Sequence, residues 1–444
     1  MNRVPRVLRR TWVARRAWKR AACTGLHDGQ RVGAMYMGEP RSRRGRATDD
    51  GDEWNARPPL RNGSLACNGA SFRGRAYSMT YKPITTLEIE KYGCIKKAKF
   101  ELTPIHALIG PNDSGKSTTL RALRTVAQFA AGNFGHEPNI RPEPFDPMLD
   151  NVPNSNRLKI GYADGLGYGI GSKNDHHDVH ETIFEGSAEV ATGVSSRGWN
   201  LNGIVFGGAS VQGREDLATR LKDRITTATL VRFDPDCLRT AGQLIPESKG
   251  IRFADERGTG LASVFDAIIN RDAEAFALIQ SNVRSLFPSI VKLGLININN
   301  SQKAMAITLT DGSRIGATAM SEGLLYYLGF AALRYLVDSK LFLVEEPENG
   351  LHPARIAEVM ATLREISKTS QVIIATHSPL VVNELEGDEV TVVTREVEKG
   401  TQATLLKNVP HYEDSRKVYE NGELWLSYAD GKLEQPLLTG RPRE

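Results

Sequence analysis

Cysteine is scarce in this sequence of 444 residues, and no run of 18 or more apolar residues occurs in it. The four cysteines are far apart and form no CxxC pair, which argues against a disulfide scaffold and a typical zinc site. Without a long apolar run there is no candidate transmembrane helix. We therefore expect a soluble cytoplasmic protein without a membrane partner, long enough for two or three folded units.

Positive charge is concentrated at the start of the chain. The formal net charge is +5, but 17 of the 57 lysines and arginines and only 6 of the 52 acidic residues lie in residues 1–78. The rest of the chain therefore carries a net charge of −6. An acidic body does not attract nucleic acid as a whole, so a DNA partner would need a local basic patch.

The basic tail of residues 1–78 shows neither the period of a helix nor that of a strand, and we expect it to be unstructured. Its arginines interrupt every candidate apolar core, so it is not a secretory signal peptide. Three interpretations stay open: an upstream, non-native extension, a nucleic-acid-binding arm, or an organellar targeting segment. The first strand-like stretch begins at Ile84, just after Met79, and this favours an extension that ends before Met79.

The order of patterns along the body predicts one domain split by an insert. Strand-like stretches lead into a glycine-rich loop and a helix from Lys116 to about Ala131. A connection rich in proline and asparagine follows, then weak strands, then a helical stretch, before strand–loop–helix order resumes. The predicted segments are the tail at 1–78, an N-terminal lobe at 79–157, an insert at 158–304, a C-terminal lobe at 305–400 and a C-terminal strand and helix extension at 401–444.

The glycine-rich loop lies between an apolar strand and a helix and matches the phosphate-binding pattern G-x-x-x-x-G-K-[ST] in full. In such a loop the backbone N–H groups wrap phosphates, and the helix N-terminus adds partial positive charge. Lys116 is expected to reach the β and γ phosphates of ATP, and the Ser117 hydroxyl to bind Mg²⁺. The predicted nucleotide-binding residues are Gly110, Pro111, Asn112, Asp113, Ser114, Gly115, Lys116, Ser117 and Thr118.

Two further apolar strands end in polar residues. Residues 341–344 are apolar and are followed by Glu345 and Glu346, and residues 371–375 lead towards His377. At the carboxyl end of a buried parallel strand, one carboxylate can hold the shell of a Mg²⁺ ion, and the next can polarise water for attack on the γ phosphate. His377 stands where a sensor of the γ phosphate is expected.

This order of motifs resembles the ABC-type ATPases of the SMC/RecF-like branch, most closely the ATPase domain of the OLD (overcoming lysogenization defect) family. The resemblance covers residue 84 to about residue 393. It implies an α/β P-loop NTPase fold, namely an ABC-type ATPase head with a mixed β-sheet and an inserted helical and small-β subdomain. The roles that it implies are a signature loop at Ser321, Glu322 and Gly323, catalysis by Glu346 and His377, and metal binding by Ser117 and Glu345.

The resemblance also implies ATP hydrolysis with Mg²⁺ by a head-to-tail homodimer, in which the signature loop of one subunit grips the γ phosphate held by the other. Ser321 alone would be an ordinary helix cap, and both roles are compatible. We expect a nucleic-acid-linked regulator that acts with a separate effector protein in phage defence, with DNA as a further partner. Two alternatives stay open: a RecF-like ATPase that clamps DNA during repair, and an ATP-gated scaffold with little turnover.

Three departures from the family pattern narrow these expectations. Glu345 stands where aspartate is usual, so its contact with Mg²⁺ is expected through water or with shifted geometry. The signature loop lacks the second glycine and the glutamine of transporter subunits, which argues against a transporter. The 67 residues after His377 contain no Glu and Asp-x-Asp set of the TOPRIM domain that OLD nucleases carry, so we expect no nuclease chemistry in this chain.

Several weaker signals have ordinary explanations. Tyr92 either stacks on adenine or packs in the core. Adjacent histidines within residues 175–181 rarely converge on one ion, so a solvated loop is preferred to a metal site. Four glycines that alternate over residues 165–171 lack a following helix, so a flexible loop is preferred to a dinucleotide site. No residue is assigned to the glutamine that senses Mg²⁺ in ABC proteins.

Overall fold

The computed structural model describes residues 81–130, 156–172, 178–196, 215–225, 228–336, 339–396, 400–410, 412–416 and 419–428. These residues belong to one compact unit, Tyr77–Glu444. The expected basic tail, the proline-rich connection and the adjacent histidines His176 and His177 lie outside the described residues. Among the helices that the structure describes, none has both the length and the apolar character needed to cross a membrane.

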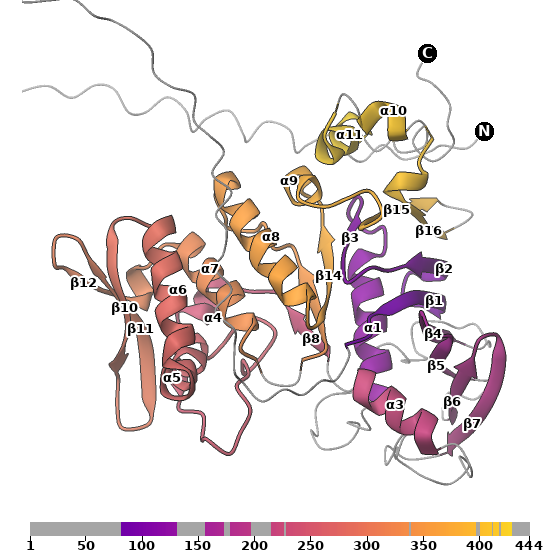
Figure 1. The fold of residues 1–444 in the computed structure, drawn as a ribbon, viewed down its shortest axis with the longest axis horizontal. Helices are drawn as coiled ribbons and strands as arrows, with labels where there is room; N and C mark the ends of the chain where they lie inside the picture. Colours follow the sequence, from indigo (N-terminus) through magenta and orange to yellow (C-terminus); the bar gives the residue numbers. More distant parts are fainter. Residues whose placement is uncertain are drawn as a thin grey trace, which may run out of the picture. The chain divides into compact units, whose positions relative to one another are not determined.

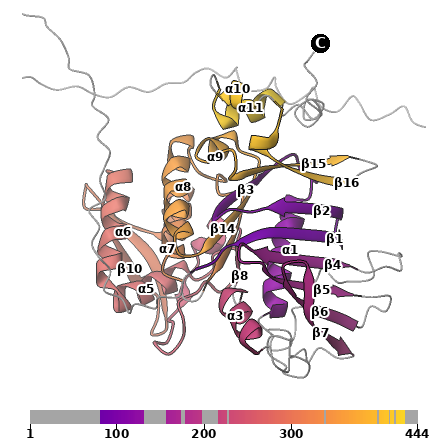
Figure 2. The same ribbon diagram turned by 45° about the vertical axis from the view of Figure 1, so that its right-hand side comes forward.

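The first sheet contains six antiparallel strands in the order β2-β1-β4-β5-β6-β7, which can be followed in Figure 2. The predicted insert therefore does not form a separate unit at its start, because β4 pairs directly with β1 and places Ile160 opposite Leu87. Local patterns do not show pairing partners so far apart in sequence. The strands are β1 (Ile84–Tyr92), β2 (Ile95–Glu101), β4 (Arg157–Tyr162), β5 (Leu166–Ser172), β6 (Asp178–Glu185) and β7 (Ala188–Ser196).

Three of the four alternating glycines, Gly167, Gly169 and Gly171, lie in strand β5, so the preference for a flexible loop was wrong for them, whereas Gly165 lies in the bend before the strand. A Cβ at Gly169 would lie 2.9 Å from the Phe184 ring on the neighbouring strand β6, and one at Gly167 would lie 3.3 Å from the Phe184 Cβ. Glycine weakens an isolated strand, but it lets a large side chain lie flat on the backbone. Phe184 is buried and fills the space that the missing side chains leave.

The central sheet is mixed, as predicted, and its order is β16-β15-β3-β14-β13-β8. All neighbouring strands are parallel except the pair β15 and β16. Strand β8 comes from the predicted insert, so the insert also contributes to the central sheet. The strands are β3 (Ile105–Ile109), β8 (Ala228–Val231), β13 (Leu341–Glu345), β14 (Gln371–Thr376), β15 (Val390–Glu396) and β16 (Gly400–Leu405).

Both faces of the central sheet are buried. Along β13 and β14 the side chains alternate between two apolar cores, because successive residues of a strand point to opposite faces. Leu343 and Ile373 join the core that contains α1 (Lys116–Ala130) and α3 (Glu215–Ile225). Val344 and Ile374 join the other core, which the remaining helices build. Runs of apolar residues without polar alternation are therefore expected in these strands.

The second core is covered by helices and by a small antiparallel sheet, β10-β11-β12 with β9 paired to β11 (Figure 1). The helical stretch predicted near residues 258–287 is two helices, because the Asp272 side chain accepts from the Ala275 N–H and caps a second helix. The helices are α4 (Pro235–Leu238), α5 (Leu261–Arg271), α6 (Ala273–Leu286), α7 (Glu322–Leu333), α8 (Pro353–Ser367), α9 (Pro379–Asn383), α10 (Tyr412–Arg416) and α11 (Asn421–Tyr428), and the strands are β9 (Gly242–Gln243), β10 (Ile290–Asn297), β11 (Gln302–Leu309) and β12 (Arg314–Gly316).

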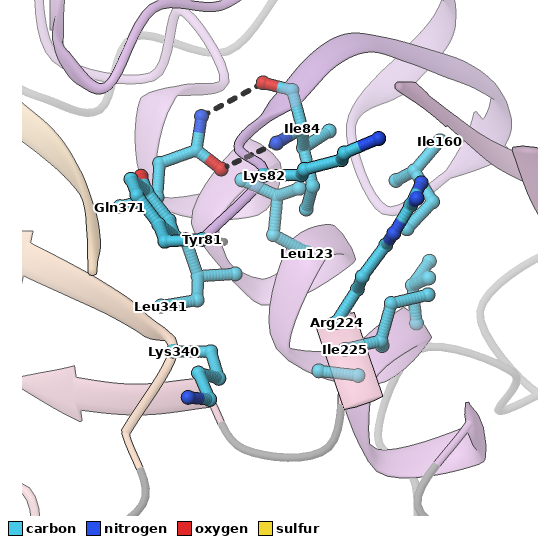
Figure 3. Close-up of a pocket in the computed structure, with 12 residues that line it drawn as sticks. Tyr81, Lys82, Ile84, Leu123, Ile160, Arg224, Ile225, Lys340, Leu341 and Gln371 are labelled. Atoms are coloured by element: carbon cyan, nitrogen blue, oxygen red, sulfur yellow. Dashed lines mark hydrogen bonds between the residues drawn. The ribbon is translucent and has the colours of Figure 1, made fainter. Parts of the chain in front are cut away.

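The start of β1 is held to the central sheet by one buried amide. The Gln371 side chain accepts from the Ile84 N–H at 2.9 Å and donates to the Ile84 carbonyl at 2.8 Å, as Figure 3 shows, and it also donates to the Thr103 carbonyl. Tyr81 and Lys82 line the cavity beside this contact. The Lys82 ammonium forms an ion pair with Asp164 at 3.0 Å. The ordered contacts of the unit therefore reach back to residue 81.

A chain that starts at Met79 is expected to fold and to hydrolyse ATP like the full chain, because it keeps Tyr81, Lys82 and the Gln371 contacts. Urea unfolding and phosphate release measure this. A loss of more than about 2 kcal/mol, which exceeds typical surface effects, would contradict it. As the matched control, a chain that starts at Ile84 loses the cover of the cavity and the ion pair to Asp164, so it should be measurably less stable.

Candidate functional site

The glycine-rich loop connects β3 to α1 by a path that needs glycine. Gly110 follows β3, and a Cβ there would lie 1.9 Å from the carbonyl oxygen of Val393 in β15. Gly115 has a φ of +111°, and Asp113 has a φ of +64°. Both values lie in the left-handed region, which glycine enters without strain and aspartate tolerates. This tight strand–loop–helix connection is of the kind that wraps phosphates.

Lys116 reaches back across the loop that precedes it. Its ammonium donates to the carbonyl oxygens of Gly110 and Pro111, both at 2.7 Å, and the residue is 9% exposed. Carbonyl oxygens satisfy an ammonium without neutralising it, so its charge stays available to an anion. Ser117 is exposed in the first turn of α1, and the hydroxyl of the half-buried Thr118 lies 3.3 Å from the Cys94 sulfur.

The hairpin of β15 and β16 contacts the backbone of the glycine-rich loop. The Thr401 hydroxyl donates to the Ser114 carbonyl at 3.0 Å, and the Arg395 guanidinium donates to the Asp113 carbonyl at 3.5 Å. Asn112 and Asp113 remain exposed. The predicted boundary between residues 400 and 401 thus falls inside a strand that contacts the nucleotide-binding loop.

Glu345 is the last residue of β13, and its side chain is 8% exposed and lies beside the guanidinium of Arg232. Strands β13 and β8 pair in parallel with Val344 opposite Val231, so the next residues, Glu345 and Arg232, emerge together. The Arg232 Nε lies 3.6 Å from a Glu345 carboxylate oxygen, and its side chain is 65% exposed. Sequence reasoning did not single out Arg232, because no local pattern showed that β8 lies next to β13.

Glu346 and His377 lie together after the neighbouring parallel strands β13 and β14. Glu346 has a φ of +47°, an uncommon value outside glycine, and its N–H donates to the Ala375 carbonyl of β14 at 2.8 Å. One Glu346 oxygen lies 3.6 Å from the His377 Nδ1, and the other accepts from the Asn349 amide at 2.5 Å. Strained backbone conformations of this kind are often found at functional sites, where the surrounding structure holds them in place.

A third carboxylate, Glu348, joins this group, although sequence reasoning gave it no role. Its side chain is 8% exposed. One oxygen accepts from the Thr376 hydroxyl at 2.6 Å and from the His377 N–H at 3.3 Å, and it lies 3.6 Å from the His377 Nδ1. Its position two residues after Glu346 was a weak signal, and only the fold of the loop shows that Glu348 also lies next to His377.

The predicted signature residues form the start of α7. The Ser321 hydroxyl caps the helix by accepting from the Leu324 N–H at 3.4 Å, and both Ser321 and Glu322 are exposed. The loop after β13 lies against this helix: a Cβ at Gly323 would be 3.7 Å from the Gly350 carbonyl, and a Cβ at Gly350 would be 2.2 Å from the Tyr326 ring. The signature helix and the loop that carries Glu346 are therefore in direct contact within one chain.

Tyr92 packs in the core and does not offer its ring for stacking on adenine. It is 2% exposed, and its hydroxyl lies 2.9 Å from the Thr125 hydroxyl inside α1. Its position 24 residues before Lys116 could not reveal this burial. In the described part of the histidine-rich segment, Glu181 is buried and accepts from the Tyr168 hydroxyl at 2.7 Å. The described residues contain no group of three or more His, Cys, Asp or Glu that could hold a metal ion.

The residues present fit a nucleotide with Mg²⁺. Lys116 and the N-terminus of α1 suit phosphate oxygens, because both carry positive charge next to the backbone N–H groups of the loop. The Ser117 hydroxyl and the Glu345 carboxylate are hard oxygen donors of the type that Mg²⁺ prefers. The fit rests on the chemistry of these donors and on their positions at the carboxyl ends of β3 and β13.

Comparison with solved structures gives matches to SMC head domains. A structure of "the SmcHead bound to the C-winged helix domain of ScpA" matches with 15% identity and a TM-score of 0.46, covering 72% of this chain and 97% of that one. The "SMC head domain from Thermotoga maritima" matches with 15% identity and a TM-score of 0.39, covering 72% and 98%. An Smc head from Pyrococcus furiosus with an extended coiled coil, bound to the C-terminal domain of ScpA, matches with 13% identity and a TM-score of 0.39, covering 76% and 98%.

No curated protein matches the sequence. A family model matches residues 105–383, which is more than half of the chain and runs from β3 to α9. This range contains the glycine-rich loop, the signature residues, the three glutamates and His377. The chain therefore belongs to the family described as "AAA domain, putative AbiEii toxin, Type IV TA system".

Proposed function

We propose that this protein binds ATP with Mg²⁺ and hydrolyses it at a site that a second copy of the chain completes. One observation carries the proposal. The nucleotide-binding loop, His377 and the glutamates follow β3, β14 and β13, which are adjacent parallel strands of the central sheet. The carboxyl ends of parallel strands meet at one edge of a sheet, which is where ligands bind in open α/β folds.

In this mechanism the loop and Lys116 hold the β and γ phosphates and neutralise charge that builds up during transfer. Glu346 accepts a proton from the attacking water, and its exposed side chain, 38% accessible, lets water approach. His377 stands beside it to sense the γ phosphate. Bound Mg²⁺, held by Ser117 and Glu345, would supply charge neutralisation between the phosphate oxygens.

The homodimer part of the proposal rests on Ser321 and on the resemblance to SMC/RecF-like ATPases. Ser321 and Glu322 are exposed at the N-terminus of a helix of 12 residues, where an anion is favoured. In that arrangement Ser321 of one subunit contacts the γ phosphate on the other, so two composite sites form between two chains related by a twofold axis.

For the physiological role, we propose an OLD-like regulator that acts with a separate effector protein in phage defence. The family description includes the words "putative AbiEii toxin, Type IV TA system", which supports a role in a system with a second protein component. A RecF-like clamp on DNA and an ATP-gated scaffold are the alternatives. The two alternatives differ in what stimulates ATP hydrolysis. DNA should stimulate a clamp, and DNA should have no effect on a scaffold.

Phosphate release by the purified chain tests the enzyme proposal. We expect hydrolysis that needs Mg²⁺ and that rises with the square of protein concentration when the protein is dilute, because two chains build each site. Two additions to this assay distinguish the three proposed roles. One is duplex DNA, and the other is the protein encoded by the adjacent gene. Stimulation by DNA alone would favour the clamp, and a stable complex with the neighbouring protein would favour the effector system. Rates that are strictly proportional to protein concentration throughout would contradict the shared site.

A further inference from the structure

Glu348 connects the two loops that carry Glu346 and His377. Its own loop follows β13, and its carboxylate crosses to the turn after β14, where it accepts from the Thr376 hydroxyl at 2.6 Å and from the His377 N–H at 3.3 Å. The Thr376 hydroxyl in turn accepts from the Ser378 N–H at 2.9 Å. One buried side chain therefore fixes three consecutive residues of the turn that presents His377.

The arrangement puts the His377 imidazole between two carboxylates. Its Nδ1 lies 3.6 Å from Glu346 and 3.6 Å from Glu348. Glu346 is 38% exposed, whereas Glu348 is 8% exposed and anchored from two sides. Small displacements of reacting groups reduce rates strongly, so a buried and anchored carboxylate next to a partly exposed one is suited to setting the distance between His377 and Glu346.

The other oxygen of Glu348 indicates that stability is not the main role of this side chain. This Oε2 atom is buried, and none of the described residues donates to it. A buried carboxylate oxygen without a donor costs stability, and such groups need an explanation. An amide in the same place would keep one acceptor oxygen without the buried charge.

We propose that Glu348 is a positioning residue of the ATPase site, which holds the His377 turn in register with Glu346 through Thr376 and the His377 backbone. The inference rests on the proposed ATP hydrolysis and adds a residue to it. Glu348 touches neither the phosphates nor the attacking water in this role. Its effect passes through the placement of His377, so it should appear in the turnover number and not in ATP affinity.

Steady-state hydrolysis, ATP binding and thermal unfolding test the role. Glu348→Ala should lower kcat by about 10- to 100-fold, as supporting residues typically do, with ATP affinity unchanged within about twofold. Glu348→Gln keeps an acceptor for Thr376 and for the His377 N–H, so it should restore kcat to within about fivefold of the original chain. It should also unfold at no lower temperature. If the alanine variant does not fold, Thr376→Val, which removes the hydroxyl donor, takes its place with a similar expected loss.

A second background separates positioning from general destabilisation. In chains that already carry His377→Ala, the change Glu348→Ala should lower kcat by less than about threefold further, because residues that act as a unit are not additive. Glu358→Gln on α8 is the matched control, since its Oε2 is also buried without a donor among the described residues, and it should leave kcat unchanged. Equal losses with and without His377, or an unaltered kcat in Glu348→Ala, would overturn the inference. Should Lys116→Ala and Glu346→Gln also leave hydrolysis unaltered, the ATPase proposal itself would be wrong.

Discussion

Replacing Lys116 by alanine is expected to abolish ATP binding while the fold persists. The Lys116 ammonium donates to the backbone carbonyl oxygens of Gly110 and Pro111 at 2.7 Å, and neither carbonyl carries a net charge that its removal would leave uncompensated. Losing one partner of a buried charge-assisted contact costs about 2 kcal/mol or more in binding, which is roughly a 30-fold or greater loss of affinity. Titration of a fluorescent ATP analogue measures it.

The matched control is Lys340→Ala, because this lysine precedes β13 and lines the cavity of Figure 3 at the amino end of the central sheet. It should bind ATP like the original chain. Unchanged affinity in Lys116→Ala would mean that the glycine-rich loop does not hold the triphosphate. A lowered unfolding temperature in that variant alone would show that the ammonium serves the loop and not the nucleotide.

The second large effect is expected at the boundary between two chains. Glu346→Gln removes the proton acceptor, so hydrolysis should fall by about 10²- to 10⁴-fold while ATP binding persists, which leaves a dimer trapped with ATP. Ser321→Arg should do the opposite. A bulky cation on the exposed start of α7 blocks closure on the partner, yet each chain still binds ATP. Light scattering with and without ATP distinguishes the two states.

Mixing two inactive variants gives the sharpest form of this experiment. In a head-to-tail dimer of one Lys116→Ala chain and one Ser321→Arg chain, both lesions fall in the same composite site, and the other site is intact. If dimers form at random and each site works alone, an equal mixture should regain roughly a quarter of the original activity. If Glu346→Gln stays monomeric with ATP, the predicted ATP-trapped dimer does not form. If Ser321→Arg monomers hydrolyse ATP strongly, the site does not need a second chain.

Some of the fold follows from local sequence alone. The strands predicted at 341–345 and 371–375 match β13 and β14 to within one residue, because continuous apolar runs that end in polar residues are typical of buried parallel strands. The helix after the glycine-rich loop also ends within one residue of its predicted end. The mixed sheet at the centre of an α/β fold was implied by the resemblance to ABC-type ATPases, and it is confirmed.

Other parts could not be predicted, because they depend on partners that are distant in sequence. Strand β4 pairs with β1, and β8 lies beside β13, so the segment predicted as an insert contributes to both large sheets. The glycines of β5 lie in a strand that pairs with β4 and β6, and Phe184 packs over Gly167 and Gly169. The sequence left open whether Tyr92 stacks on adenine or packs in the core, and the contact with Thr125 shows that it packs in the core.

The same reason explains which site residues were found. The residues of the glycine-rich loop are contiguous in the sequence, so the motif alone predicts that the loop binds phosphate. Arg232 and Glu348 act across strands, and the contact of each is made with a residue more than 25 positions away. Tertiary placement decides such roles, and it leaves only weak local signals.

The contact between Tyr326 and Gly350 has a consequence for how two sites would behave together. The Tyr326 ring of α7 lies directly on the Gly350 backbone, and it leaves no room for a side chain there, because an added Cβ would be 2.2 Å from the ring. Close-packed contacts transmit displacement instead of absorbing it. In the proposed homodimer, closure of the Ser321 end of one subunit on its partner's nucleotide would therefore press on the subunit's own Glu346 loop. Each chain would thus report the occupancy of its partner's site to its own, and hydrolysis would depend on ATP concentration more steeply than for two independent sites.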